Sequence, residues 1–273
     1  MNYKKLLNVF LAVVPVTLFF LWQNNAIIVN EYEYMTKEIS SRFDGFRIVQ
    51  ISDLHNKEFG KKQRYLLNII RNAAPDMIVL TGDQVDSRKT NIKITMDFIQ
   101  EALKIAPVYF VSGNHELRLA QKAWNDLMGG FMQLGAIPMD NRVMEITKDG
   151  ELGFYLIGLS DHHLTDDTLK NISSSLPSNS LKIVLAHEPQ YMENYRYGGA
   201  DLVLSGHVHG GQFRIPGVGG LLAPNHGFFP KYSAGPYQEG NTTMIVSRGL
   251  GNSVIPIRIF NRPQIIIVKL VKK

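Results

Sequence analysis

The sequence predicts an α/β fold with two sheets, and the distribution of apolar runs along the 273-residue chain leads to that prediction. In the first half, short apolar runs typical of β-strands (46–52, 77–81 and 107–111) alternate with two helical patterns (61–73 and 92–103). The second half has five more strand-like runs (152–159, 181–186, 202–205, 243–247 and 265–270) and one convincing helix (165–172). We therefore expect a sheet covered by helices, with a second sheet packed against it.

The polar residues at the strand ends indicate where a site should form. Each predicted strand of the first half ends in a polar cluster, and the carboxyl ends of neighbouring strands meet at one edge of such a sheet. No segment has the composition of an internal linker, so residues 44–273 are expected to form one domain.

Composition and charge exclude several kinds of site. The chain has no cysteine, which excludes disulfides, zinc–thiolate sites and cysteine nucleophiles. Its net charge of +5 favours an anionic substrate or an anionic membrane surface, although a slightly unbalanced solvated surface explains it as well. Because the basic residues are scattered along the chain, we expect no nucleic acid as a partner.

The N-terminal segment predicts a membrane anchor. Residues 6–22 carry no charge and follow Lys4 and Lys5, and as a helix they span about 25 Å. The lysines place the N-terminus in the cytoplasm, so we expect a single-pass cell-membrane protein whose folded domain is extracytoplasmic. Residues 1–35 would be this uncleaved transmembrane signal anchor and its linker. A cleaved signal peptide, for which residues 23–26 are a poor cleavage site, and a buried core helix are the alternatives.

Five polar clusters hold most of the side chains that can bind metal. Each cluster alone is compatible with an ordinary turn, but together they contain five of the eight histidines. Oxygen and imidazole ligands without thiolate suit manganese, iron or zinc, and a carboxylate shared by two such ions builds a site that binds phosphate and activates water. The clusters are Asp53-Leu54-His55, Gly82-Asp83-Gln84-Val85-Asp86, Gly113-Asn114-His115-Glu116, His187-Glu188-Pro189 and Gly206-His207-Val208-His209-Gly210-Gly211.

In these clusters the chain resembles the calcineurin-like metallophosphoesterase family, whose motifs occur here in the family's order from about residue 45 onward. The resemblance implies a four-layer α/β/β/α sandwich of two mixed sheets, and hydrolysis by water activated between two divalent ions. It also implies that His115 contacts the substrate phosphate and assists the leaving group, with Asp86 orienting His115 or a ligand. The implied metal ligands are Asp53, His55 and His209 for one ion, Asp83 as the bridge, and Asn114, His187 and His207 for the other.

The resemblance is strongest to the membrane-associated bacterial branch of the family, which includes phosphodiesterases and UDP-diacylglucosamine pyrophosphatases. It implies a phosphodiester or pyrophosphate substrate, either a small molecule or linked to lipid. Arg248 and His226 are candidates for holding a second phosphate, and the aromatic, basic loop 217–237 either covers the substrate or packs on the sheet. The turn at residues 161–163 is expected at the surface, with a substrate contact as the alternative. The alternative functions are a catalytically silent phosphate-binding protein, a nuclease and a phosphomonoesterase.

Overall fold

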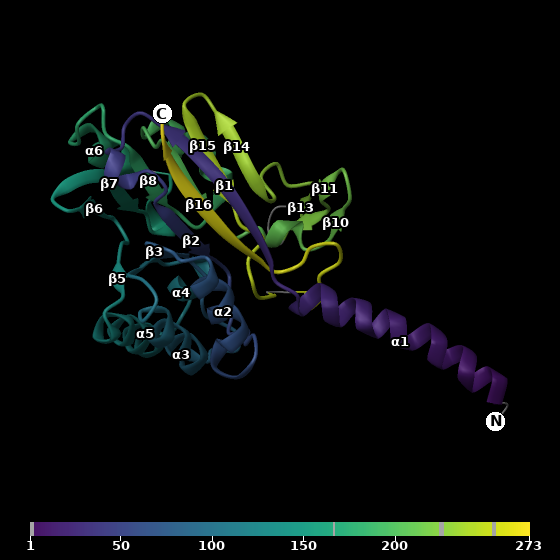
Figure 1. Cartoon of the computed structure of the whole chain (residues 1–273). Coiled ribbons are helices and arrows are strands. Elements are labelled where there is room, and N and C mark those ends of the chain that lie inside the picture. The colour runs from purple at the N-terminus through teal and green to yellow at the C-terminus, as the bar shows by residue number, and fades with distance from the viewer. Residues whose placement is uncertain (1–2, 166, 224–226, 253–254) are drawn as a thin grey trace.

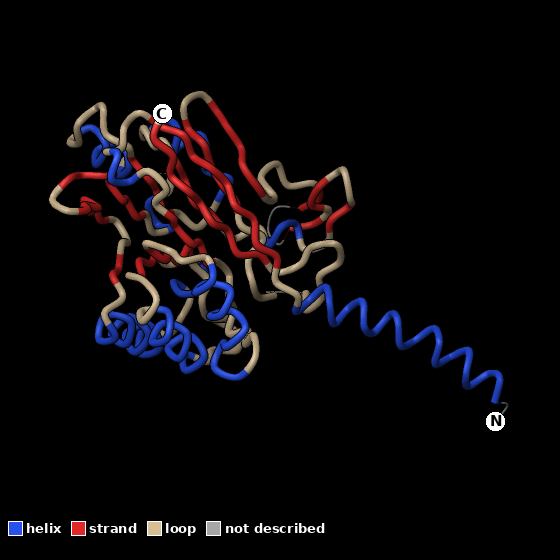
Figure 2. The backbone as a smooth tube through the Cα atoms, in the orientation of Figure 1, coloured by secondary structure: helices blue, strands red, loops and turns tan. Residues whose placement is uncertain are grey.

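Two mixed six-stranded sheets pack face to face, and helices cover the outer face of each (Figure 1). The computed structural model describes residues 3–165, 167–223, 227–252 and 255–273, apart from the side chains of residues 4–9. In Figure 2 the helices of the first half, apart from the N-terminal one, gather on one side of the strands. The predicted α/β fold with two mixed sheets is thereby confirmed.

The first sheet combines the N-terminal strands with the last strand of the chain. Its strands, in spatial order, are β1(Ile28–Thr36), β16(Gln264–Lys272), β2(Arg47–Ile51), β3(Met77–Thr81), β4(Val108–Val111) and β5(Ile137–Pro138). All neighbours are parallel except β16 and β2. The apolar stripes of three helices bury one face of this sheet, as their periodicity predicts. These helices are α2(Arg64–Asn72), α3(Ile92–Ala102) and α5(Gln121–Leu134).

The second sheet comes from the second half of the chain. Its strands, in spatial order, are β14(Gly235–Glu239), β15(Thr242–Val246), β9(Leu202–Ser205), β8(Lys182–Leu185), β7(Glu151–Gly158) and β6(Arg142–Lys148). The helices α6(Thr168–Ser174) and α7(Met192–Tyr197) contribute to the buried cluster on its outer face. Shorter elements complete the fold: η1(Ser41–Phe43), η2(Lys61–Gln63), α4(Asn114–Leu117), η3(Asp161–His163), η4(Pro189–Tyr191), η5(His209–Gly211) and the strand pairs β10(Arg214–Ile215) with β11(Gly219–Gly220) and β12(Leu222–Ala223) with β13(Gly227–Phe228).

The buried layer between the sheets fixes one sheet against the other. Ile48 and Val79 of the first sheet and Ile183 and Leu204 of the second belong to one cluster of buried side chains. All four are fully buried, and each contributes about 1.5–3 kcal/mol relative to an exposed position. This packing holds the carboxyl ends of β2 and β3 against those of β8 and β9, where the polar clusters begin.

The prediction that residues 1–35 are only an anchor and a linker is wrong for residues 28–35. These residues belong to β1(Ile28–Thr36), a strand of the first sheet. This strand pairs in parallel with β16 along its whole length, from Ile28 opposite Gln264 to Thr36 opposite Lys272. Its residues alternate between exposed and partly buried, as in an edge strand with one face on the protein. The folded domain therefore begins before residue 44.

Helix α1(Tyr3–Asn25) contains the predicted residues 6–22 and projects away from the sheets (Figure 1). Over the residues that the structure describes, no helix is both long enough and apolar enough to cross a membrane, so the predicted transmembrane helix is not supported. The last turn of α1 is polar and belongs to the folded domain. Gln23 is buried and accepts a hydrogen bond from the Asn261 backbone N–H, and Asn24 accepts one from that of Arg258.

Candidate metal centre

The chain leaves the strands through left-handed turns that direct the polar side chains inward. The predicted site residues with positive φ are Asp53 (52°), His55 (45°), Asp83 (54°), His207 (70°) and His209 (49°). This conformation is uncommon for residues other than glycine, although aspartate and histidine tolerate it better than most. Such backbone persists only where the surroundings impose it, and it is concentrated at functional sites.

Two glycines allow the strand-end turns to approach each other. A Cβ on Gly82, whose φ is +85°, would lie 2.5 Å from Nδ1 of His187. A Cβ on Gly206 would lie 1.9 Å from Oγ of Ser52 and 2.4 Å from a carboxylate oxygen of Asp53. Glycine at both positions is therefore a requirement of the close contact between the two sheets' turns.

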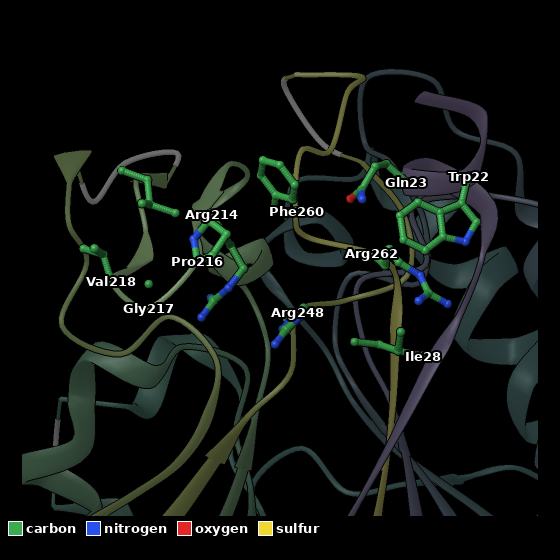
Figure 3. Close-up of a pocket in the computed structure, with 12 residues that line it drawn as sticks. Trp22, Gln23, Ile28, Arg214, Pro216, Gly217, Val218, Arg248, Phe260 and Arg262 are labelled. Atoms are coloured by element: carbon green, nitrogen blue, oxygen red, sulfur yellow. The ribbon is translucent and has the colours of Figure 1, made fainter. Parts of the chain in front are cut away.

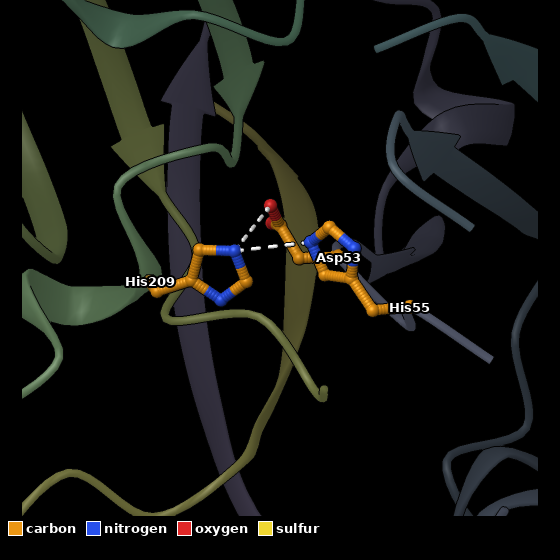
Figure 4. A group of neighbouring side chains, drawn as sticks. All are labelled: Asp53, His55 and His209. Atoms are coloured by element: carbon orange, nitrogen blue, oxygen red, sulfur yellow. Dashed lines mark hydrogen bonds and ion pairs between the residues drawn. The ribbon is translucent and has the colours of Figure 1, made fainter. Parts of the chain in front are cut away.

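The first group of side chains that could hold an ion is Asp53, His55 and His209 (Figure 4). Nε2 of His209 lies 3.1 Å from Nε2 of His55 and 3.5 Å from Oδ1 of Asp53. Asp53 is fully buried, and its carboxylate accepts hydrogen bonds from Ser52 Oγ and from the backbone N–H of His207. The turns after β2 and β9, one from each sheet, meet here.

The second group is Asp83, His187 and His207. Oδ2 of Asp83 lies 3.2 Å from Nε2 of His187, and that nitrogen is also 3.2 Å from Nδ1 of His207 and from Oδ1 of Asn114. Nδ1 of His187 lies 2.7 Å from the Thr81 carbonyl oxygen, so it donates there and turns Nε2 toward the carboxylate.

Asp83 and His55 connect the two groups. Oδ2 of Asp83 lies 3.6 Å from Nε2 of His55, and both residues form a third group with His115. The structure therefore brings together all the residues that the motifs assign to two ions, with Asp83 between the two sets. The bridging role itself stays a prediction.

His115 lies beside both groups, with its ring centroid 4.6 Å from that of His55. Its Nδ1 accepts a hydrogen bond of 3.1 Å from the backbone N–H of Ser87. Asp86, which was predicted to orient His115 or a ligand, lies 3.6 Å from the same nitrogen, beyond hydrogen-bond distance. The Ser87 backbone is therefore the direct partner of the ring, and Asp86 acts on it through charge.

Burial and neighbouring charges shift the pKa values of the ionisable side chains at the site. Burial lowers the pKa of His55 to about 4 and raises that of Asp53 to about 6. Burial would also raise the pKa of Asp83, but the facing His187 ring holds it well below its usual value. Burial alone would lower the pKa of His187, whereas the carboxylate of Asp83 raises it well above the usual value. Such a buried set of nitrogens and carboxylates fits divalent cations, which favour the charged carboxylates.

Sequence reasoning missed the role of Glu116, although the residue lies within one of the motifs. Its carboxylate accepts hydrogen bonds from the backbone N–H groups of Asp83 (2.7 Å), Gly113 (2.9 Å) and Val85 (3.1 Å). Burial raises its pKa to about 7. Glu116 thus joins the loops after β3 and β4, and its position next to His115 was the available signal.

Arg258 and Asn261 were also missed, because no motif contains them. The Asn261 amide donates to the carbonyl oxygen of His209 at 2.6 Å, and Nη2 of Arg258 lies 3.5 Å from Nδ1 of His209. Both side chains are fully buried. Together they position the turn that carries His209 from a distant part of the sequence.

The predicted surface turn at residues 161–163 is only partly exposed. His162 is exposed, but both carboxylate oxygens of Asp161 are buried without a hydrogen-bond partner among the described residues. Burial raises the Asp161 pKa to about 8, against the opposing charge of His187. The expectation of a simple surface turn is therefore wrong for Asp161, since its side chain points inward.

Of the two predicted substrate contacts, the structure describes only Arg248. Arg248 lines a pocket beside α1, and His226 is outside the described residues. In the loop 217–237, Phe229 and Tyr232 line a pocket together with Val208, next to His207 and His209. A substrate-binding role for these two aromatic residues stays a prediction.

The comparisons with known proteins agree with this geometry. Residues 46–211 match the model of the calcineurin-like phosphoesterase family. The chain is 28% identical over 251 residues to the uncharacterized metallophosphoesterase YkuE of Bacillus subtilis, covering 89% of this chain and 85% of that protein. It is 30% identical over 234 residues to the phosphodiesterase YaeI of Escherichia coli, covering 83% and 82%.

A solved structure shares the fold at low sequence identity. The NAD nucleotidase of Haemophilus influenzae superposes with a TM-score of 0.50 at 16% identity, covering 75% of this chain and 50% of that one. The family match spans more than half of the chain and contains the residues of all three ligand groups. The chain therefore belongs to the calcineurin-like phosphoesterases and is a phosphoester hydrolase whose His/Asp groups suit two divalent metal ions.

Proposed function

We propose that the chain hydrolyses a phosphodiester or a pyrophosphate bond, in a substrate that is linked to lipid or held near a membrane. The observation that supports this reaction is that the third ligand group shares His55 with the first group and Asp83 with the second. Two divalent ions, when bound there, supply an activated water and positive charge opposite the phosphoryl oxygens. The remaining chemistry belongs to the side chains around them.

The ligand set would be Asp53, His55, Asp83, Asn114, His187, His207 and His209. In this assignment Asp83 faces both positions, and the Thr81 carbonyl keeps the proton of His187 on Nδ1, so that Nε2 can face the ion. The hydrogen bonds from Ser52 and His207 hold the Asp53 carboxylate in its orientation before any ligand arrives. Such preorganisation lowers the cost of binding and of charge development.

In this proposal His115 protonates the leaving oxygen. A backbone N–H can only donate, so the Ser87 hydrogen bond makes Nδ1 of His115 the acceptor and leaves the ring proton on Nε2. To act as an acid the ring would first take a second proton on Nδ1, which the Asp86 carboxylate 3.6 Å away would stabilise and which would displace the Ser87 N–H from that nitrogen. Acid assistance of this kind contributes about 10²–10⁴-fold.

A pocket beside the ligands, with two basic residues in its lining, favours a substrate whose phosphate carries a second group. It has a volume of about 400 Å³ and is lined by His55, Asp86, Arg88 and Lys89, among others. A diester or pyrophosphate has a second anionic or ester group to place there, whereas a simple monoester leaves it unused. This observation supports the diester and pyrophosphate class over a phosphomonoesterase.

The direct test is a substrate panel measured with added manganese. It should contain p-nitrophenyl phosphate, bis(p-nitrophenyl) phosphate and a lipid-linked pyrophosphate, each with and without a chelator. We expect chelator-sensitive hydrolysis that is fastest on the diester or the pyrophosphate. Preference for the monoester would refute the substrate class, and metal binding without any turnover would favour a silent phosphate-binding protein.

The membrane association remains part of this proposal, with the domain outside the cytoplasm. Its support is the row of exposed apolar side chains on α1, which includes Phe10, Leu11, Val13, Leu18 and Leu21. We expect the full chain to stay with membranes after a high-salt wash, and external protease to digest the domain in spheroplasts. A chain lacking residues 1–21 keeps Gln23, Asn24 and β1, so it should fold and leave the membrane fraction. Recovery of the full chain in the soluble fraction would contradict the association.

A further inference from the structure

A second pocket, of about 600 Å³, lies between the end of α1 and the hairpin formed by β10 and β11 (Figure 3). None of its lining residues belongs to the three ligand groups. The pocket nevertheless borders the metal centre, since Arg214 donates a 2.8 Å hydrogen bond to the Gly210 carbonyl, next to His209. Its lining residues are Trp22, Gln23, Ile28, Arg214, Ile215, Pro216, Gly217, Val218, Gly219, Arg248, Phe260 and Arg262.

The pocket has three positive charges and, among its described lining residues, no acidic side chain. Figure 3 shows Arg214 and Arg248 toward the hairpin and Arg262 toward Trp22. Burial lowers the pKa of Arg248, and the neighbouring positive charge of Arg214 lowers it further. Burying cations without a counter-charge costs free energy, and an anion bound in the pocket would lower that cost.

Arg248 is the arginine best suited to bind a ligand. Its Nε is buried and has no hydrogen-bond partner within the described part of the chain, whereas its backbone N–H is held by the Gln264 side chain. Arg214 is fixed by the Gly210 carbonyl and the Ser233 hydroxyl, and Arg262 by the Ala26 carbonyl. Two guanidinium groups are therefore positioned beforehand, and a third has an unused donor.

The rim of the pocket is apolar. Trp22, Val218 and Phe260 are each about half exposed or more, and Ile215 beside them is also exposed. The rim continues onto α1 through a contact between the rings of Phe260 and Phe19, 5.8 Å apart. A ligand that fills the pocket would thus meet cations inside and hydrocarbon at the entrance.

We propose that this arginine pocket binds a phosphoryl anion, in a second site distinct from the metal centre, and that its preferred ligand is a phosphate ester with an apolar substituent. Guanidinium groups bind phosphate oxygens through paired, charge-assisted hydrogen bonds, and three arginines line this pocket. The exposed rim adds affinity for hydrocarbon next to the phosphate. The ligand's phosphate comes from a lipid headgroup or from a soluble phosphate, which the experiment separates.

Trp22 provides the signal for a binding test. The chain has two tryptophans, and the Arg262 guanidinium lies 4.7 Å from the centre of the Trp22 ring. In a Trp124→Phe background, Trp22 is the sole tryptophan and reports a ligand that displaces or orders Arg262. Emission is followed in the metal-loaded protein during titration with sodium phosphate at constant ionic strength, with phosphatidylcholine vesicles containing phosphatidic acid, and with vesicles of phosphatidylcholine alone.

We expect a saturable change in Trp22 emission with the phosphatidic acid vesicles and weaker saturation with sodium phosphate. Arg248→Gln should weaken the affinity for both ligands at least about tenfold, since it removes a charged donor. Arg248→Lys should restore part of that affinity. Arg71→Gln removes the same charge from the exposed surface of α2 and should change neither titration. Thermal unfolding of each variant checks that the fold is retained.

Each outcome decides the proposal. Saturation by both phosphate sources identifies the phosphoryl group alone as sufficient, and saturation only by phosphatidic acid vesicles identifies the lipid headgroup. Equal affinities in Arg248→Gln and its parent, equal losses in Arg248→Gln and Arg71→Gln, or no saturation by either source would overturn it. Because Trp22 reports binding and not turnover, failure of the proposed hydrolysis would leave this test unaffected.

Discussion

The two sheets contribute different chemistry to the same centre. The turns after the first sheet's strands carry both carboxylates, Asp53 and Asp83, together with Asn114, His55 and His115. The ligands that the turns after the second sheet's strands contribute are all imidazoles, from His187, His207 and His209. The first sheet thus supplies the carboxylates of the ligand groups, and the second supplies the imidazoles that complete the first two groups.

This division means that neither sheet forms the centre by itself. Asp83, on the first sheet, lies 3.6 Å from His55 of its own sheet and 3.2 Å from His187 of the other. The buried layer between the sheets therefore determines the distances on which metal binding depends. Changes on the first sheet should affect charge and catalysis, whereas changes on the second should affect the completeness of one ligand group.

The largest effect is expected for Asp83→Asn, which removes the charge that faces both ligand groups. Metal content should fall, and kcat/KM should drop by roughly 10⁴-fold, equivalent to about 5.5 kcal/mol. Metal analysis and diester hydrolysis measure the two effects. Asp126→Asn, an exposed change on α5, serves as the control and should alter neither. Two ions at full occupancy with normal activity would show that Asp83 does not connect the groups.

His115→Gln comes next and separates catalysis from ligation within the first sheet. If His115 is the acid, metal content stays unchanged, and alkyl diesters slow by about 10²-fold while nitrophenyl diesters slow less. His162→Gln, an exposed histidine change, is the matched control. Loss of metal would instead assign His115 to the third ligand group, with His55 and Asp83.

A smaller effect is expected for Glu116→Gln, because Glu116 acts through the loops that carry the ligands. Its carboxylate accepts three backbone N–H groups, and an amide replaces one accepting oxygen by a donor. Metal affinity should weaken by about tenfold, with kcat at saturating metal nearly unchanged. A metal titration of activity distinguishes this from a direct catalytic role, and Glu101→Gln on α3 is the control.

The smallest effect on activity, and a clear effect on stability, is expected for Asp161→Asn on the second sheet's side. Burial raises the folded pKa of Asp161 to about 8, above the unfolded value of 3.8. Its contribution to stability is therefore present below pH 4 and is lost as the pH rises toward 8. Without added metal, the variant should lose less stability than the parent over this range, by on the order of 1–3 kcal/mol at pH 9. Urea unfolding at pH 5, 7 and 9 measures the difference, and parallel curves would contradict it.

The sequence predicted the elements whose patterns are local and missed those that depend on distant partners. Strands β3 and β9 have the predicted bounds, because each is a short, fully buried apolar run. Helix α5 was missed, since Gly129 and Gly130 weaken its helical pattern while packing against the sheet imposes the helix. Strand β1 was missed because its partner, β16, lies at the opposite end of the sequence.

The same distinction applies to the sites. The ligands of the metal centre follow strands in short motifs, so the sequence alone brought them together. The arginine pocket has no motif, because Arg214, Arg248 and Arg262 come from separate segments and meet Trp22 only after folding. Arg248 was singled out for its charge, but nothing in the sequence indicated its neighbours.

The position of β16 between β1 and β2 has a consequence for biosynthesis. Strand β2 ends at Ile51 and must wait for β16, which begins at Gln264 and is therefore translated long after β2. At 5–20 residues per second, the β2 edge stays unpaired for on the order of 10–40 s. During that interval the nascent chain exposes an apolar strand edge that favours aggregation. A stop codon that removes β16 should therefore give an insoluble product, even though every metal ligand has already been translated.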